Sequence, residues 1–216
     1  MIRVKICCIN SIAEARLAIA MGASALGLVS EMPSGPGVIS EARIAEIATA
    51  VPPPIATVLL TSKTIADDII DQQRRCKVNT IQLCDRVSFD ELIKLREHLP
   101  GIGLVQVIHV SDRASIDEAK TVAGHVDALL LDSGNQSLAI KELGGTGRTH
   151  DWSLSRAVVE SVTVPVFLAG GLNSHNVIEA IEKVRPFGVD ICTGVRTNGN
   201  LDRGKLESFM ALVLSQ

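Results

Sequence analysis

The stretch Ala128–Trp152 has the sequence ALLLDSGNQSLAIKELGGTGRTHDW. Its opening apolar run is too short for a helix and is typical of a strand buried on both faces, and Asp132 stands where that strand ends. The loop that follows carries Gly144, Gly145, Thr146 and Gly147. Such small residues let backbone N–H groups close around an anion, although a glycine-rich loop is also a common turn. Asp151 is predicted to cap a helix, so an acidic group and a candidate anion site share one strand-to-helix connection.

The same alternation of strand and helix runs along the whole chain. Apolar strand cores are predicted to begin at Arg3, Ala25, Ile55, Asn79, Gly103, Asp127, Pro165 and Val189, with amphipathic helical stretches between them. Eight such units in 216 residues, with no Gly-x-Gly-x-x-Gly turn after the first strand, favour a closed barrel over a doubly wound open sheet. The predicted fold class is therefore α/β, a (βα)8 TIM barrel of eight parallel strands. No linker divides the chain, so one domain over residues 1–216 is expected.

Two of the units are longer than the others. Their excess lies in Ser30–Val38 and in the loop between Asp132 and Asp151, and both segments follow a predicted strand end. In barrels of this kind the strand-to-helix loops form the active face. We therefore expect ligand contacts in these two loops.

Composition excludes several classes of protein. Hydrophobic residues make up 46% of the chain, with four Phe, one Trp and no Tyr, so the core must be aliphatic, which suits buried parallel strands. The net charge of −3 and dispersed basic residues argue against a nucleic-acid partner, and no apolar run suggests a membrane span. The N-terminal MIRVKICC resembles no secretion signal, and five Cys without a framework spacing fit reduced thiols, so a cytoplasmic location is expected.

The first strand carries two candidate functional residues. Lys5 and Cys7 share one face of it by alternation, and Cys7 at its end would open onto the active face. For Cys7 a packing role is the competing interpretation, because Cys is among the most buried residue types. An ammonium group inside a barrel needs a counter-charge or a ligand, so Lys5 is expected either in a structural ion pair or in contact with substrate.

Glycines also follow the last two predicted strands, at Gly170, Gly171 and Gly194. This is where barrels of this class hold a phosphate, on backbone amides and the N-terminus of a short helix. Together with the glycines after the sixth strand they predict a small phosphorylated ligand. A metal site is not expected, because the five His show no i, i+2 or i, i+4 pairing and no Cys-x-x-Cys spacing accompanies them.

Collinear motifs over almost the whole chain resemble the phosphoribosylanthranilate isomerase family. They are KIC at Lys5–Cys7, GASALG at Gly22–Gly27, IQL at Ile81–Leu83, LLLD at Leu129–Asp132, GGTGRTHDW at Gly144–Trp152, LAGGLNSHNV at Leu168–Val177, GVD at Gly188–Asp190 and TGV at Thr193–Val195. The resemblance implies an Amadori rearrangement in tryptophan biosynthesis, which turns an N-(5-phosphoribosyl)anthranilate into a 1-deoxyribulose phosphate. It also implies Cys7 as general base, Asp132 as general acid and no cofactor. Gln82, Thr193 and Arg196 complete the expected substrate-binding set.

The departures from the family pattern leave the substrate open. Cys8 replaces a usual Gly, Cys84 and Asp85 follow Gln82–Leu83, and Arg196 replaces a Glu. Gly37 stands where the family has an Arg that grips the anthranilate. A Gly37→Arg substitution is therefore expected to lower KM. A paralogous isomerase, epimerase or aldolase on another phosphosugar, with Lys5 as the Schiff-base candidate, and a non-catalytic phosphate-ligand binding protein are the alternatives. No helix face is over-apolar, so the sequence predicts no oligomeric state.

Overall fold

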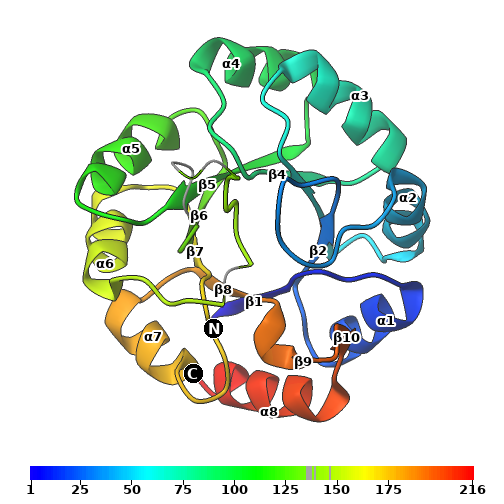
Figure 1. The fold of residues 1–216 in the computed structure, drawn as a ribbon, viewed down its shortest axis with the longest axis vertical. Helices are drawn as coiled ribbons and strands as arrows, with labels where there is room; N and C mark the ends of the chain where they lie inside the picture. The colour runs from blue at the N-terminus through cyan, green and yellow to red at the C-terminus, as the bar shows by residue number, and fades with distance from the viewer. Residues whose placement is uncertain (135–137, 139, 146) are drawn as a thin grey trace.

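Eight parallel strands close into a barrel in sequence order, and the last strand pairs with the first. The computed structural model describes residues 1–134, 138, 140–145 and 147–216. The barrel strands are β1 (Arg3–Ile6), β2 (Ala25–Val29), β3 (Ala56–Thr61), β4 (Thr80–Leu83), β5 (Gly103–His109), β6 (Ala128–Asp132), β7 (Val166–Leu168) and β8 (Gly188–Ile191). Figure 1 looks down this barrel, with helices around its outside. The predicted (βα)8 barrel is confirmed.

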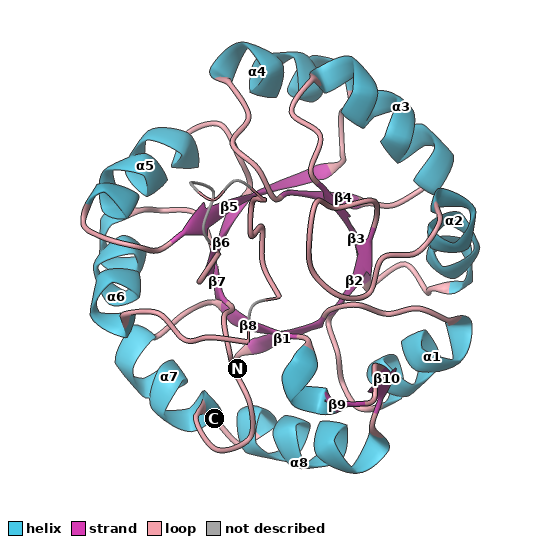
Figure 2. Cartoon of the chain, in the orientation of Figure 1, coloured by secondary structure: helices cyan, strands magenta, loops and turns pink. Residues whose placement is uncertain are grey.

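A helix follows every barrel strand along the chain. The helices are α1 (Ile12–Ala20), α2 (Glu41–Ala50), α3 (Ala66–Cys76), α4 (Phe89–His98), α5 (Ala114–Ala123), α6 (Trp152–Ser161), α7 (Val177–Val184) and α8 (Arg203–Leu214). Between β8 and α8 lie a 3-10 helix η1 (Thr193–Val195) and a small hairpin of β9 (Arg196–Thr197) and β10 (Asn200–Leu201). Figure 2 shows the hairpin beside α1, outside the barrel.

Short polar side chains fix where several helices begin. Ser11, Ser40 and Ser88 each accept a backbone N–H of the first turn, as N-cap residues do. Asp151 accepts the N–H of Ser153 at 2.8 Å, so its predicted capping role is confirmed. The cap sets the point at which the long loop after β6 ends.

Alternation along the strands sorts the side chains into two cores. Val4 and Ile6 of β1 belong to the large core between the barrel and the helices, which is aliphatic throughout most of its extent. Cys7 belongs to a smaller cluster inside the barrel, with residues such as Leu60 and Leu130. Because polar side chains such as Gln82 are buried on this inner face too, the interior is where chemistry can be placed.

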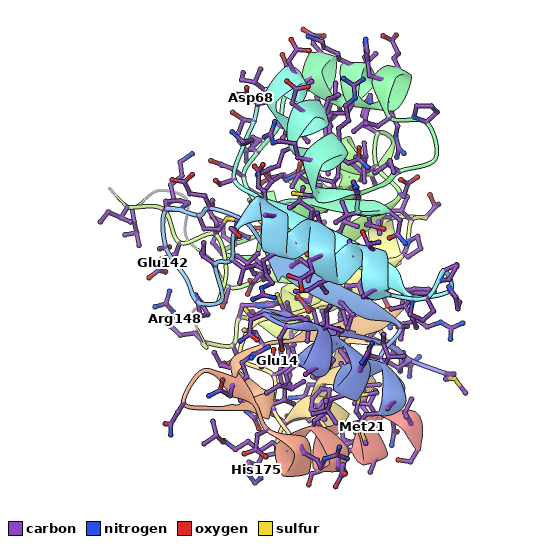
Figure 3. All side chains as sticks on the ribbon, turned by 90° about the vertical axis from the view of Figure 1, so that its right-hand side faces the viewer. Glu14, Met21, Asp68, Glu142, Arg148 and His175 are labelled. Atoms are coloured by element: carbon purple, nitrogen blue, oxygen red, sulfur yellow. The ribbon has the colours of Figure 1, made fainter. Side chains whose placement is uncertain are left out.

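The long strand-to-helix loops project from one end of the barrel. Figure 3 shows this end from the side, with Glu142 and Arg148 of the loop after β6 labelled on it. Their side chains form an ion pair within that loop. Within the described part of the chain, no helix is both long and apolar enough to cross a membrane.

Candidate active site

A cavity lies at the carboxyl ends of the strands, with an empty volume of about 710 Å³ that includes space open to solvent. Its lining brings together most of the residues expected from the sequence, namely Cys7, Gln82, Asp132, Gly144, Gly145, Gly147, Gly170, Gly171 and Thr193. Thr146, also expected here, lies outside the described residues. Lys5, Gly194 and Arg196 are not among the lining residues.

Cys7 lies directly after β1 and is buried, with 6% of its surface exposed. A Cβ atom on Gly27 of β2 would lie 2.9 Å from its Sγ, so only glycine at that position leaves room for the thiol. The thiols of Cys192 and Cys8 hydrogen-bond to Cys7 and, with the charge on Lys5, hold its pKa well below the usual range against the opposing effect of burial. Cys7 is thus set up to be a thiolate.

Lys5 is held in a buried ion pair. Its Nζ lies 2.8 Å from Oδ2 of Asp190, and both side chains are almost fully buried. Burial disfavours the ammonium, but the Asp190 carboxylate and the nearby Cys7 and Cys84 thiols together outweigh that effect and raise the pKa of Lys5. Of the two roles left open for Lys5, the structure places it in the ion pair, below the cavity lining.

Asp132 ends β6 and its carboxyl group faces the cavity. The backbone N–H of Ser133 donates to Oδ1 at 2.7 Å, and a Cβ on Gly144 would lie 2.7 Å from Oδ2. Burial raises the pKa of Asp132 despite the Ser133 hydrogen bond and the nearby His109. The cavity therefore holds a group biased toward a thiolate and a carboxyl group biased toward its protonated form.

The glycines expected to bind an anion adopt backbone conformations that other residues avoid. Gly147, Gly170 and Gly171 have φ values of 68°, 81° and 64°. A Cβ on Gly171 would lie 2.7 Å from the backbone carbon of Arg148, so the loops after β6 and β7 pack closely. η1 starts at Thr193 beside them. Backbone from three successive strand ends thus borders one side of the cavity.

Arg196, which the sequence analysis expected in the substrate-binding set, is not among the residues that line the cavity. Its guanidinium pairs with Glu14 at 3.0 Å and donates to the carbonyl oxygens of Cys7 at 3.2 Å and Cys8 at 2.6 Å. The side chain is buried outside the cavity lining. Its charge is used to hold the turn that follows β1.

The surroundings of Gly37 leave little space for the side chain of the Gly37→Arg substitution, which the sequence analysis expected to lower KM. Gly37 has φ of 80°, and a Cβ there would lie 2.5 Å from Cβ and 2.8 Å from Sγ of Cys8. Cys8 is itself a non-glycine residue at φ 63°. The drop in KM expected for Gly37→Arg alone is therefore opposed by the contact with Cys8.

The cavity-lining residues that the sequence analysis did not place in the site include Cys8, Asp190 and Cys192. Strand alternation could have found the last two, because Asp190 and Cys192 share the inner face of the β8 segment. Among the described residues, Oδ1 of Asp190 and Oε1 of Gln82 are buried without a hydrogen-bond partner. Both oxygens can accept hydrogen bonds from a ligand hydroxyl. In the same part of the chain, no group of three or more His, Cys, Asp or Glu side chains could hold a metal ion.

A closed parallel (βα)8 barrel with a cavity at the carboxyl ends of its strands has the architecture of the TIM-barrel enzymes. Residues 4–211 match the family model described as N-(5'phosphoribosyl)anthranilate (PRA) isomerase. The chain belongs to the phosphoribosylanthranilate isomerase family.

Relatives and solved structures agree with this membership. The isomerase of Methanocella arvoryzae is 36% identical over 90% of this chain and 89% of its own length, and that of Haloferax volcanii is 37% identical over 98% and 92%. The isomerase structure from Thermotoga maritima superposes with a TM-score of 0.85 at 28% identity over both whole chains. A phosphoribosylanthranilate isomerase in complex with reduced 1-(o-carboxyphenylamino)-1-deoxyribulose 5-phosphate gives a TM-score of 0.83 at 27% identity, again over both whole chains.

Proposed function

We propose that the chain converts N-(5-phosphoribosyl)anthranilate into 1-(2-carboxyphenylamino)-1-deoxyribulose 5-phosphate, a step of tryptophan biosynthesis, with Cys7 as general base and Asp132 as general acid. The reaction class, an aldose–ketose isomerisation, follows from family membership. The observation that carries the residue assignment is the opposite bias of two groups in one cavity, since the pKa of Cys7 is lowered and that of Asp132 is raised.

The chemistry needs one proton donor and one proton acceptor. The protonated Asp132 carboxyl gives its proton to the furanose ring oxygen, the C1–O bond breaks, and the anilino nitrogen forms an imine with C1. The Cys7 thiolate then removes the proton from C2. The resulting enolamine tautomerises to the ketose. Burial of both groups supports the assignment, because water that competes for these protons is excluded.

The remaining cavity residues supply binding in this proposal. Gly147, Gly170, Gly171 and the η1 start at Thr193 would surround the phosphate with backbone N–H groups. Oδ1 of Asp190 and Oε1 of Gln82 would accept hydrogen bonds from the sugar hydroxyls, which would satisfy two otherwise unpartnered buried atoms. Leu143 and Met32 line an apolar wall that suits the aromatic ring.

Two features separate this function from its alternatives. A Schiff-base aldolase needs a neutral, accessible lysine, whereas Lys5 is buried, ion-paired and biased toward its protonated form. A mere binding protein does not need two groups with opposed pKa shifts. A cytoplasmic location belongs to the proposal and rests on the biosynthetic role of the family.

The test combines a cell and an enzyme assay. The chain should restore growth of a tryptophan auxotroph that lacks this isomerase, and the purified protein should consume phosphoribosylanthranilate with loss of its fluorescence. The matched control is Cys76→Ala, a buried thiol on α3 away from the cavity. If the wild type neither complements nor turns over this substrate, another phosphosugar is the substrate.

A further inference from the structure

Three thiols meet at the base of the cavity and form what we call the thiol cluster, Cys7, Cys8 and Cys192. Sγ of Cys192 lies 2.7 Å from Sγ of Cys8, and Sγ of Cys8 lies 3.9 Å from Sγ of Cys7. The cluster joins the end of β1 to the end of β8, across a barrel seam of paired strands. Proton transfer on the substrate needs only Cys7, so the other two thiols require a separate explanation.

The position of Cys8 is fitted closely by its surroundings. Its backbone adopts φ 63°, a region where non-glycine residues are uncommon and are held by their environment. Gly37 provides the space into which the Cys8 side chain projects. Arg196 fixes the carbonyl oxygens on either side of the Cys7–Cys8 peptide link. This arrangement directs Sγ of Cys8 at Sγ of Cys192 instead of at solvent.

The distance between Cys8 and Cys192 is close to bonding. A disulfide has an S–S bond of about 2.05 Å, so a small side-chain movement would bring the two sulfurs together. Cys192 is only partly buried and lines the cavity, which gives a small oxidant access to the cluster. Cys7, whose pKa is lowered chiefly by the other two thiols, is the reactive member of the cluster.

We propose that Cys8 and Cys192 form a reversible disulfide, and that its formation returns an oxidised Cys7 to the thiolate. The oxidant is a small peroxide such as hydrogen peroxide. The Cys7 thiolate attacks one peroxide oxygen, the O–O bond breaks, and the hydroxide that leaves is protonated to water. Cys7 is then a sulfenic acid.

Two exchanges return Cys7 to its starting state. The Cys192 thiol attacks Sγ of Cys7, and the S–O bond of the sulfenic acid breaks. The hydroxyl group takes the thiol proton and departs as a second water, and the product is a Cys7–Cys192 disulfide. The Cys8 thiol attacks the Cys192 sulfur. Cys7 departs as a thiolate, and the proton released from Cys8 replaces the one that converted the first hydroxide into water. In sum, two thiols lose two electrons and two protons to one peroxide, and two waters form. A dithiol reductant reverses the disulfide.

The consequence for the enzyme is protection of its base. A sulfenic acid that finds no thiol is oxidised further to the sulfinic acid, which a dithiol does not reduce. A neighbouring pair of thiols intercepts the sulfenic acid first. Formation of the disulfide does not depend on the proposed function, whereas the benefit to turnover does.

The experiment therefore identifies the disulfide links and the oxidation state of each cysteine by peptide mass spectrometry. Wild type, Cys8→Gly, Cys192→Ala and the control Cys76→Ala are exposed to hydrogen peroxide, quenched, alkylated and mapped by peptide mass spectrometry. We expect a Cys8–Cys192 link in wild type and in Cys76→Ala, removed by dithiothreitol. In Cys8→Gly we expect a Cys7–Cys192 link in place of the Cys8–Cys192 link, because the second exchange has lost its thiol. In Cys192→Ala we expect sulfinic acid to make up a several-fold larger share of the oxidised Cys7. Glycine suits the φ of Cys8, and circular dichroism checks that each variant folds.

Activity gives a second, separate measure. Each variant is compared with its own untreated rate. Wild type and Cys8→Gly should regain their rates with dithiothreitol, whereas Cys192→Ala should not. Absence of a Cys8–Cys192 link in oxidised wild type, or equal sulfinic acid at Cys7 in all four proteins, would overturn the proposal. A missing isomerase activity would leave the mass result intact and would count only against the proposed function.

Discussion

A Cβ atom on Gly37 would lie 2.5 Å from the Cβ of Cys8, so the two positions compete for one space. The family pattern described above has glycine at the position of Cys8 and arginine at that of Gly37. In this chain the larger of the two side chains belongs to Cys8, which follows β1, and the loop after β2 carries only the glycine. The two departures from the family pattern are therefore in direct contact, and we interpret them as one structural exchange.

This exchange leads to a prediction about substrate affinity. We expect Gly37→Arg alone not to lower KM for phosphoribosylanthranilate, because its Cβ collides with Cys8. The double variant Cys8→Gly with Gly37→Arg should lower this KM by about 10-fold or more, which is the effect of one charge-assisted hydrogen bond to the carboxylate. Steady-state kinetics measures both. Cys8→Gly alone is the control, and a double variant that folds but keeps the wild-type KM would contradict the exchange.

The second prediction concerns the acid–base pair. Cys7→Ser and Asp132→Asn should each reduce turnover by at least about 10²-fold, because each removes a proton-transfer group, and should leave phosphate binding nearly unchanged. The rate is measured by loss of substrate fluorescence and the binding by calorimetry. Either residue leaves the proposed mechanism if its variant turns over like the wild type.

Asp132→Asn should also not be destabilised at neutral pH. The folded-state pKa of Asp132 is raised above its unfolded value. The contribution of this group to folding stability is therefore lost as pH rises from the unfolded-state pKa through the folded-state pKa. The amide has no such charge to bury. We therefore expect the urea midpoint of Asp132→Asn at pH 7 to equal or exceed that of wild type, with a flatter dependence on pH above the ordinary carboxyl pKa of about 4. A lower midpoint at pH 7 would refute this account of the buried carboxyl.

How far the sequence could predict this arrangement is clear from particular residues. The strand ending at Asp132 and the Asp151 cap were predictable, because an apolar run and a short acidic side chain act locally. The placement of Arg196 was not, because its partner Glu14 is far away in the sequence. The same holds for the pairing of Lys5 with Asp190 and for the contact of Cys8 with Gly37, which arise only when the barrel closes.

The pKa of Cys7 provides a fourth prediction. Its largest lowering comes from the Cys192 thiol, so Cys192→Ala should raise the Cys7 pKa and reduce its alkylation at neutral pH. Iodoacetamide labelling of Cys7, followed by peptide mass spectrometry across pH, measures the shift. Cys76→Ala is the control, since that thiol lies on α3. The acidic limb of kcat/KM should move to higher pH in parallel, because a base is lost as pH falls through its pKa.

The buried ion pair gives a prediction of stability. Lys5→Met leaves Asp190 buried without its counter-charge, which should cost about 3–5 kcal/mol of unfolding free energy. Arg43→Met, which breaks an exposed pair with Glu46, is the matched control and should cost about 1 kcal/mol or less. Urea unfolding at pH 7 compares them. Equal losses in the two variants would show that the Lys5 pair is not a structural support.

The phosphate site can be tested with two glycines of similar backbone conformation. Gly147 has φ 68° and Gly101 has φ 84°, and a Cβ on either would meet no atom within 4 Å. Gly147 lines the cavity, whereas Gly101 lies in the helix-to-strand turn before β5, at the opposite end of the barrel. Alanine at either position therefore carries a comparable backbone strain, of roughly 1 kcal/mol or more.

Only Gly147→Ala should weaken phosphate binding, because strain there moves the N–H groups that would hold the anion. We expect its dissociation constant for inorganic phosphate to rise by about 10-fold, the loss of one charge-assisted hydrogen bond, while Gly101→Ala binds as wild type does. Calorimetry measures affinity, and urea midpoints verify that the two variants are destabilised alike. If both variants bind phosphate equally well, the loop after β6 does not hold the phosphate, and the glycines after β7 and β8 would have to hold it alone.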